Sequence, residues 1–261
     1  HLKPKIYKCK KCDLLFSEFA SVNFSQKYQE VEDKKYIAQI PNKEIYFREL
    51  FKNISDDINF KGRSLEIGAY YGVFSKIAKE NISNLTSIEL SNHAISYGTK
   101  NYNLNYVNKN PILFLKKNLN QFDNIFLFDV IEHLDDPFQF LLLISKNLKK
   151  DGKFIFTTFD MDTFFPKLTN KNYHWIMPMH KFYFSKKTLD YWCKISGLKI
   201  YKIKNDKRIV SLNYLFYKFS VLFPKLKFLF NYLSKLKISK KINININLND
   251  LKIFFVKKIN D

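Results

Sequence analysis

The residues best suited to chemistry gather in one stretch of the chain, around the motif Asp129-x-x-Glu132-His133. Five acidic residues stand between positions 118 and 145, where the sequence has no Lys or Arg: Asp123, Asp129, Glu132, Asp135 and Asp136. Histidine is the side chain that most readily accepts a proton near neutral pH. His133 and, further along the chain, His180 are therefore our candidates for a general base or for a group that positions an acceptor. The alternative is that both histidines only pack.

A second candidate site lies in the stretch 64–74 (SLEIGAYYGVF), where a predicted strand runs into a glycine-bearing turn and then into a helix. Such turns bind nucleoside cofactors in doubly wound sheets. Gly68 permits a tight turn, and Gly72 permits close packing of the helix on the strand. Glu89 ends the next predicted strand, where a carboxylate can accept hydrogen bonds from a ribose diol.

The order of the glycines argues against a dinucleotide. The fingerprint of a dinucleotide site is G-x-G-x-x-G, whereas this turn reads G-x-x-x-G, with Tyr70 where a glycine is often found. Glu66 precedes the turn, and a carboxylate there would repel a pyrophosphate. A cofactor with a cationic amino group and a sulfonium suits an acidic pocket better, so we expect S-adenosylmethionine rather than NAD.

Short apolar runs alternate with helical patterns from residue 63 onward, and this alternation predicts a parallel, doubly wound sheet. A helix at 44–53 comes before them. Strands are predicted at 63–67, 85–90, 124–129, 153–158, 199–204 and 251–257, and a half-buried strand at 242–248. The helices between the strands are predicted at 73–80, 93–100, 137–148 and 187–196.

Several of these segments together resemble class I S-adenosylmethionine-dependent methyltransferases. They are the stretch 65–74, Glu89, FDNIFLFDVIEHLDDP at 122–137, LKKDGKFIFT at 148–157 and WIMPMHKFYFS at 175–185, in the family's order. The resemblance implies an α/β, Rossmann-like class I methyltransferase fold, a seven-stranded mixed sheet with helices on both faces. It also implies that the cofactor is bound by Glu66, Gly68, Ala69, Tyr70, Gly72, Glu89, Leu90 and Asp129.

The resemblance further implies transfer of a methyl group to a small-molecule or sugar-containing acceptor, on oxygen or carbon, with His133 and His180 as the candidate catalytic residues. Ubiquinone-type O-methyltransferases and small-RNA end methyltransferases hold a divalent ion with a similar group. Glu-His at this position is, however, widespread in relatives that use no metal. We therefore do not expect a metal at Asp129, Glu132 and His133.

Cys9 and Cys12 form a C-x-x-C pair that looks like the second knuckle of a zinc module found ahead of some methyltransferase domains, sugar C-methyltransferases among them. Structural zinc needs four ligands, and the remaining two would lie upstream of His1. Cys193, the third cysteine, reads as a core thiol. Three cysteines make no disulfide framework, which favours a reducing, cytoplasmic location.

The formal net charge of +20 invites a nucleic-acid partner, but its composition argues against one. Only three of the 44 basic residues are Arg, the side chain that phosphate and base readers prefer. Nine basic residues and no acidic residue lie in 207–249. RNA methylation stays an alternative, as does a non-catalytic module that binds nucleic acid or membrane.

The chain divides into a remnant of the zinc module (1–20), a helical lead-in (21–60) and a methyltransferase domain (61–261) with a basic helical insertion at about 211–241, which Pro224 should split. This insertion mixes aromatic and Lys residues. It could be a membrane-surface anchor that contacts anionic lipid, or a cover over the acceptor cleft. We favour the cover, because no clean polar face runs through so many aromatics.

Overall fold

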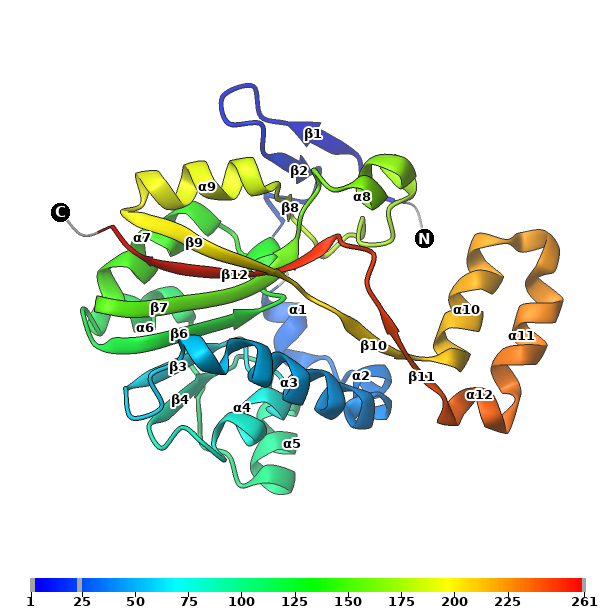
Figure 1. Cartoon of the computed structure of the whole chain (residues 1–261), viewed down its shortest axis with the longest axis horizontal. Helices are drawn as coiled ribbons and strands as arrows, with labels where there is room; N and C mark the ends of the chain where they lie inside the picture. The colour runs from blue at the N-terminus through cyan, green and yellow to red at the C-terminus, as the bar shows by residue number, and fades with distance from the viewer. Residues whose placement is uncertain (1–2, 23–24, 260–261) are drawn as a thin grey trace.

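A seven-stranded sheet forms the centre of the molecule in the computed structural model, which describes residues 3–22 and 25–259 (Figure 1). Its strand order is β5-β4-β3-β6-β7-β12-β9. In that order the strands span Tyr106–Val107, Leu85–Ile88, Ser64–Ile67, Phe122–Phe128, Leu148–Phe159, Leu251–Lys258 and Leu198–Asn205. All pairings from β5 to β7 are parallel, and β12 is antiparallel to both of its neighbours. The expected mixed sheet is confirmed.

The order of the strands determines where a ligand binds. The chain runs from β3 outward to β4 and β5 and then returns to β6 on the other side of β3. Such a reversal opens a crevice at the carboxyl ends of the strands, where α/β sheets bind their ligands. Gly68, Glu89 and Asp129 follow β3, β4 and β6 within one residue, so all three lie at this carboxyl edge.

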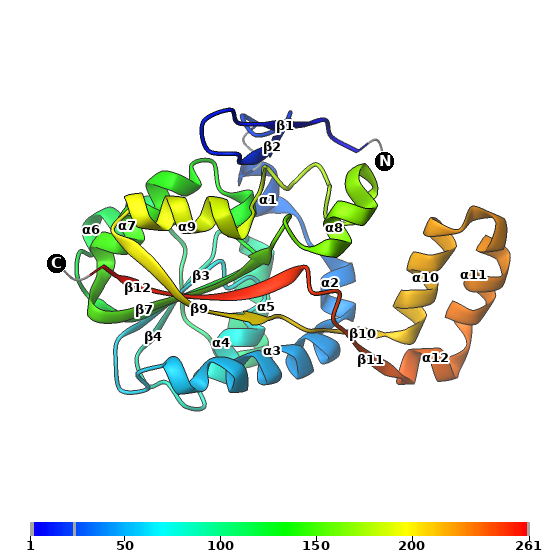
Figure 2. The same cartoon turned by 45° about the horizontal axis from the view of Figure 1, so that its top comes forward.

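Helices cover both faces of the sheet, as expected (Figures 1 and 2). The helices on one face are α3 (Ile40–Ile54), α4 (Val73–Ala78) and α5 (Asn92–Tyr102), and on the other α6 (Pro111–Lys117), α7 (Pro137–Asn147) and α9 (Lys186–Ile195). Local sequence sets their starts: Ser91 caps α5 by accepting the Ala94 N–H, and Asp136 caps α7 ahead of Pro137. Each face has its own core of fully buried aliphatic and aromatic side chains.

The N-terminal part contains a small sheet that the sequence patterns did not predict, followed by short helices within the stretch expected as a helical lead-in. A three-stranded sheet joins β1 (Ile6–Lys8) and β2 (Leu15–Ser17) to β8 (Phe182–Tyr183). Two short helices, α1 (Ser25–Glu30) and α2 (Lys34–Ala38), then lead into α3.

The remaining short elements are distributed along the chain. Helix α8 spans Phe164–Thr169, and 3₁₀ turns span Ser55–Asp57, Ile131–His133, Asn170–Asn172 and Pro224–Leu226.

The basic insertion forms a helical hairpin that projects from the carboxyl edge of the sheet (Figures 1 and 2). Its base is a two-stranded ribbon of β10 (Arg208–Ser211) and β11 (Asn243–Ile246). Its helices are α10 (Leu212–Leu222), α11 (Lys227–Lys235) and α12 (Lys237–Lys241), with the Pro224 turn between the first two. The hairpin extends away from the sheet and packs mainly on itself, so the expected cover over the acceptor cleft is wrong. In the described part of the chain no helix combines the length and apolarity needed to span a membrane.

Candidate active site

The turn after β3 depends on its two glycines. Gly68 and Gly72 have φ values of 75° and 77°, in the left-handed region that favours glycine. A Cβ on Gly68 would lie 2.6 Å from Cγ2 of Val130, and a Cβ on Gly72 would lie 2.2 Å from the Tyr106 hydroxyl oxygen. The turn can therefore pack its backbone against Val130, which follows β6, and against Tyr106 of β5 only because both side chains are missing.

Tyr70, which replaces the more usual glycine, also adopts a left-handed conformation, with φ of 50°. Its ring stacks on Tyr28 and meets Tyr36 and Tyr71 edge-on, and its hydroxyl donates a hydrogen bond to Asp33 at 3.1 Å. The tyrosine cluster therefore fastens α1 and α2 onto the glycine turn. The lead-in helices therefore pack against the predicted cofactor site.

Glu89 has the chemistry that a ribose diol needs. Its side-chain oxygens accept hydrogen bonds from the backbone N–H groups of Tyr70, Leu90 and Ser91, each at 2.7 Å. Burial raises the pKa of Glu89, opposed by these N–H groups and by the hydroxyl of Tyr28, which also hydrogen-bonds the carboxylate. A ribose hydroxyl bound here would take the place of Tyr28, whose side chain is exposed at the surface. The carboxylate thus fits a nucleoside such as that of S-adenosylmethionine.

Glu66 lies beneath the turn rather than on it. Its side chain is 3% exposed and accepts a hydrogen bond from the Ser75 hydroxyl. Burial raises the pKa of Glu66 to about 8, although the Ser75 hydrogen bond opposes this. Ala69 is buried and Leu90 half-buried around the turn. A direct role for any of these three in cofactor binding stays a prediction.

Asp129, at the end of β6, is engaged by a cation that the sequence patterns did not place there. The Arg208 guanidinium donates to both Asp129 oxygens at 2.7 Å and also pairs with Asp206 at 2.8 Å. Burial alone would raise the pKa of Asp129, but the guanidinium outweighs it and holds that pKa well below the usual range. Asp129 also has a left-handed backbone, with φ of 55°. Its predicted contact with the cofactor therefore has to coexist with this ion pair.

The expectation of an acidic pocket has to be corrected in two respects. First, Arg208 and the half-buried Lys43, whose ammonium lies over the rings of Tyr36 and Tyr46, bring positive charge to this edge. Second, the acidic residues of the stretch do not all gather there. Asp123 binds the Arg63 N–H and Lys149 at the opposite end of β6, Asp135 pairs with Lys181, and Asp136 caps α7.

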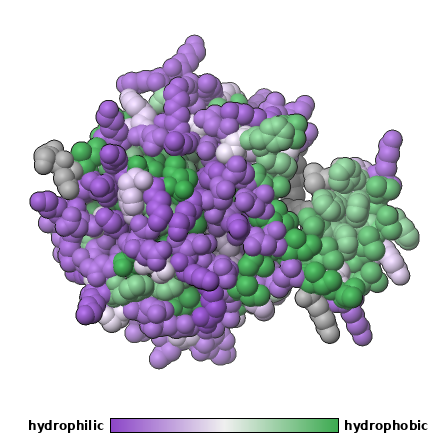
Figure 3. All heavy atoms as spheres, viewed as in Figure 1, coloured by the Kyte–Doolittle hydropathy of each residue, from purple (hydrophilic) through white to green (hydrophobic). Residues whose placement is uncertain are grey.

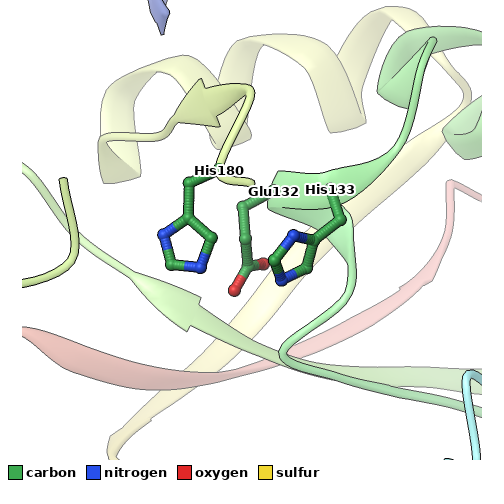
Figure 4. A group of neighbouring side chains, drawn as sticks. All are labelled: Glu132, His133 and His180. Atoms are coloured by element: carbon green, nitrogen blue, oxygen red, sulfur yellow. The ribbon is translucent and has the colours of Figure 1, made fainter. Parts of the chain in front are cut away.

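The side chains of Glu132, His133 and His180 do lie together (Figure 4). Glu132 and His133 belong to the 3₁₀ turn after β6, and His180 belongs to the segment before β8. One candidate ligand atom from each lies within 4.8 Å of the others. The two imidazole rings are 4.7 Å apart, edge to face. Glu132 is 3% and His180 4% exposed, whereas His133 is half-buried and thus more open to a ligand.

The hydrogen bonds of the two histidines define their chemistry. Nδ1 of His133 lies 2.8 Å from the Met179 carbonyl, and Nδ1 of His180 lies 2.7 Å from the Trp175 carbonyl. A carbonyl only accepts, so Nδ1 carries the proton in each ring and Nε2 keeps a lone pair. Burial lowers the pKa of His133, and burial followed by the neighbouring His133 lowers the pKa of His180 to about 3. Both rings are neutral at pH 7 and can accept a proton or bind a divalent cation.

The structure also places residues at the site that sequence reasoning missed. The hydroxyl of Thr157 donates to Asp129 at 2.8 Å, and the hydroxyl of Thr158 donates to Glu132 at 3.2 Å. Arg208 could have been suspected, because it is one of only three Arg in a chain with 44 basic residues. Nothing in the local pattern of the sequence marks the two threonines.

Cys9 and Cys12 lie apart from this site, on the turn between β1 and β2. Both thiols are half-buried, and the backbone N–H groups of Cys12 and Lys11 lower the pKa of Cys9. This favours the thiolate that a metal binds. Cys193 is buried in the core, as expected.

Residues 39–203 of the chain, more than half of its length, match the family described as a methyltransferase domain. The seven-stranded topology, the glycine turn at the carboxyl edge and this match agree. The chain belongs to that family and is a class I S-adenosylmethionine-dependent methyltransferase. No curated protein matches the chain.

Solved structures of similar fold are distant in sequence. A methyltransferase from Archaeoglobus fulgidus shares 16% identity at a TM-score of 0.57, over 87% of this chain and 100% of that one. A methyltransferase from Thermotoga maritima shares 17% identity at a TM-score of 0.54, over 92% and 98%. Magnesium protoporphyrin IX methyltransferase from Synechocystis, solved with bound S-adenosylhomocysteine, shares 9% at a TM-score of 0.53, over 92% and 96%. These likenesses concern the fold.

Proposed function

We propose that the protein methylates a hydroxyl group of a small-molecule or sugar-containing acceptor, and that His133 is the general base. The observation that supports this is the free Nε2 of a neutral, half-buried His133 at the carboxyl edge of the sheet, beside the cofactor crevice. A hydroxyl acceptor must lose a proton, and a positioned imidazole contributes typically about 10²–10⁴-fold to such a step. Methylation of carbon is the alternative within the same acceptor class.

Each residue of the candidate site then has a separate role. S-adenosylmethionine, when bound, supplies an electrophilic methyl group. Glu89 and the Gly68–Gly72 turn hold its nucleoside, and Nε2 of His133 takes the proton from the acceptor hydroxyl, which leaves the oxygen nucleophilic. His180, buried behind His133 and tied to the Trp175 carbonyl, positions the first ring.

An RNA acceptor is less well supported. All three arginines are engaged within the protein: Arg48 with Glu80, Arg63 with Gln121, and Arg208 with Asp129. Bidentate Arg forks are the usual readers of phosphates and bases, and each Arg of this chain already has a partner within the protein.

The test is a methyl-transfer screen with radiolabelled S-adenosylmethionine against nucleotide sugars, glycans, phenols and RNA. We expect transfer to a hydroxyl acceptor by the wild-type protein, and loss of at least about a hundredfold in kcat for His133→Gln with unchanged binding of S-adenosylhomocysteine. His93→Gln, an exposed histidine on α5, is the control. Wild-type kcat in the His133 variant would overturn the base assignment, and transfer to RNA alone would overturn the acceptor class.

The same screen repeated after EDTA treatment tests for a metal at Glu132, His133 and His180. We expect full activity without added cation, because Asp129, which the sequence suggested as a further ligand, is held by Arg208. Activity that disappears with EDTA and returns with Mg²⁺ or Mn²⁺ would show that a metal ion binds and activates the acceptor, and that His133 does not act as the base.

We also propose a cytoplasmic location and, for Cys9 and Cys12, a share in a structural zinc site. The lowered pKa of Cys9 supports the zinc site, which needs two further ligands. Zinc content measured on the full-length natural protein should fall in Cys9→Ser and stay constant in Cys193→Ser, which replaces a core thiol instead. Equal zinc in both variants would contradict the site.

A further inference from the structure

The helical hairpin exposes more apolar surface than a surface that meets only water needs. Five large side chains at the Pro224 turn and along α11 make up what we term the apolar ridge: Phe223, Leu226, Phe228, Leu229 and Tyr232. Each of them is at least 49% exposed, and Phe228 is 90% exposed. Figure 3 shows hydrophobic residues over most of the visible face of the hairpin, while the visible face of the body is mainly hydrophilic.

The ridge does not consist of side chains that failed to pack between α10 and α11, because these two helices have a packed apolar interface of their own. Phe230 points between the two helices, where its ring lies 5.5 Å from Phe219 and 6.4 Å from Phe216. Helix α11 therefore has two apolar faces, one against α10 and one outward. The outward face is the unexplained one.

Charge determines what can cover that face. Residues 207–249 carry nine basic residues and no acidic one, and Lys225, Lys227 and Lys235 flank the ridge with exposed side chains. A second copy of the chain would bring two such segments together, and their like charges would repel. The only Arg of the segment, Arg208, is buried against Asp129 and Asp206, which leaves no Arg fork for a nucleic acid.

We propose that the apolar ridge docks on the surface of an anionic lipid bilayer. Aromatic and aliphatic side chains that enter the headgroup region, with Lys at the level of the phosphates, are the two features of interfacial anchors. The hairpin leaves the body at the carboxyl edge of the sheet, through the β10–β11 ribbon. Docking would therefore hold the cofactor crevice near the membrane, where an acceptor in the lipid or at its surface can reach it. The proposal does not depend on methyl transfer.

The experiment is co-sedimentation of the full chain with vesicles of phosphatidylcholine alone and of phosphatidylcholine mixed with phosphatidylglycerol. We expect binding to the anionic vesicles only, weakening as salt is raised. Phe228→Ser/Tyr232→Ser should lower the vesicle affinity by at least about tenfold, and Lys225→Gln/Lys227→Gln by about fivefold for each lysine. Leu113→Ser/Leu119→Ser removes two leucines that are 60% and 53% exposed at α6 and just after it, and should bind as wild type does.

Titration with S-adenosylhomocysteine on every variant separates a lost surface from a lost fold, because the cofactor site lies in the body. Phe228→Trp gives a further readout that needs no loss of stability: its fluorescence should shift to the blue and be quenched by brominated lipid chains. No binding of the wild type to anionic vesicles, or equal binding of Phe228→Ser/Tyr232→Ser, would overturn the proposal. So would a dimer in ultracentrifugation that the same variant abolishes, since a second copy would then cover the ridge.

Discussion

At the scale of single residues, the candidate active site contains side chains whose hydrogen bonds leave one atom available. His133 and His180 commit Nδ1 to a carbonyl, and within the described part of the chain no hydrogen bond engages Nε2 of either ring. Glu89 commits its oxygens to three backbone N–H groups and offers what remains to one hydroxyl. The sequence singles out Glu89 and His133 because each stands at or after the end of a predicted strand, and His180 because of the family resemblance; their roles stay predictions. Their hydrogen-bond partners come from other segments and could not be predicted from sequence.

The pH profile of kcat should report His133. Its pKa is lowered from 6.5 by burial, so the neutral form that accepts a proton persists to lower pH than in a free histidine. Activity should therefore fall only below pH 6.5, and the fall should disappear from the residual activity of His133→Gln. An acid limb centred above pH 6.5 would contradict this, because it would require a raised pKa.

The competition at Glu89 gives a second prediction. Glu89→Gln should weaken binding of S-adenosylhomocysteine by roughly 10–100-fold, the usual loss for a hydrogen bond to a charged group. Tyr28→Phe removes the hydroxyl that occupies the carboxylate, so it should bind the same ligand as tightly as the wild type or more tightly. Calorimetric titration measures both, and a Tyr28→Phe variant with tenfold weaker binding would show that Tyr28 contacts the ligand instead.

At the scale of elements, prediction from sequence succeeded where one pattern decides the structure. Residues 125–128 of β6 form a continuous apolar run, and α7 follows its cap Asp136 at Pro137. Helices α1 and α2 lie in the stretch expected as a helical lead-in, but their bounds were not predicted, because they are short, polar and held by tertiary contacts such as the Tyr70–Asp33 hydrogen bond. The position of the hairpin was also missed, because periodicity reports helices but not the direction in which a two-stranded ribbon leaves a sheet.

The β10 strand is joined to the site by Arg208, and this can be tested through stability. Arg208→Met leaves Asp129 and Asp206 without their cation and should lower the free energy of unfolding by roughly 3 kcal/mol at pH 8. This is the lower end for a broken buried pair, because Asp129 is still 39% exposed.

The loss should shrink toward pH 4. In the wild type the pKa of Asp129 is lowered below its unfolded value of 3.8, so the ion pair contributes fully to stability at every pH above that value. In the variant the two carboxylates have no cation, and their burial is tolerated only at low pH, where they are protonated. Urea unfolding at both pH values measures the difference. Arg48→Met breaks an exposed pair with Glu80 and should cost less than about 1 kcal/mol. Equal losses in the two variants would contradict a structural role for Arg208.

At the scale of the whole molecule, the charge of +20 is unevenly distributed: residues 207–249, which include the projecting hairpin, carry nine basic residues and no acidic one, while acidic and basic residues are mixed in the body. The two parts should be separable. Ser211 and Asn243 are directly paired in the β10–β11 ribbon, so an Asn-Gly turn can replace 212–242 without breaking the register.

This deletion should leave the affinity for S-adenosylhomocysteine within a factor of about three and the thermal midpoint within a few degrees, because the hairpin packs mainly on itself. It should abolish vesicle binding. Calorimetry and co-sedimentation on the one protein decide both points, and loss of ligand binding together with the hairpin would show that the two parts are one cooperative unit.

The Arg208–Asp129 pair has a thermodynamic consequence. It places the root of the hairpin and the end of β6 in direct contact, so that whatever displaces one displaces the other. Sites joined in this way obey reciprocity: the factor by which a vesicle surface changes the affinity for S-adenosylhomocysteine equals the factor by which S-adenosylhomocysteine changes the affinity for the vesicle. With Arg208→Met, both factors should move toward one together.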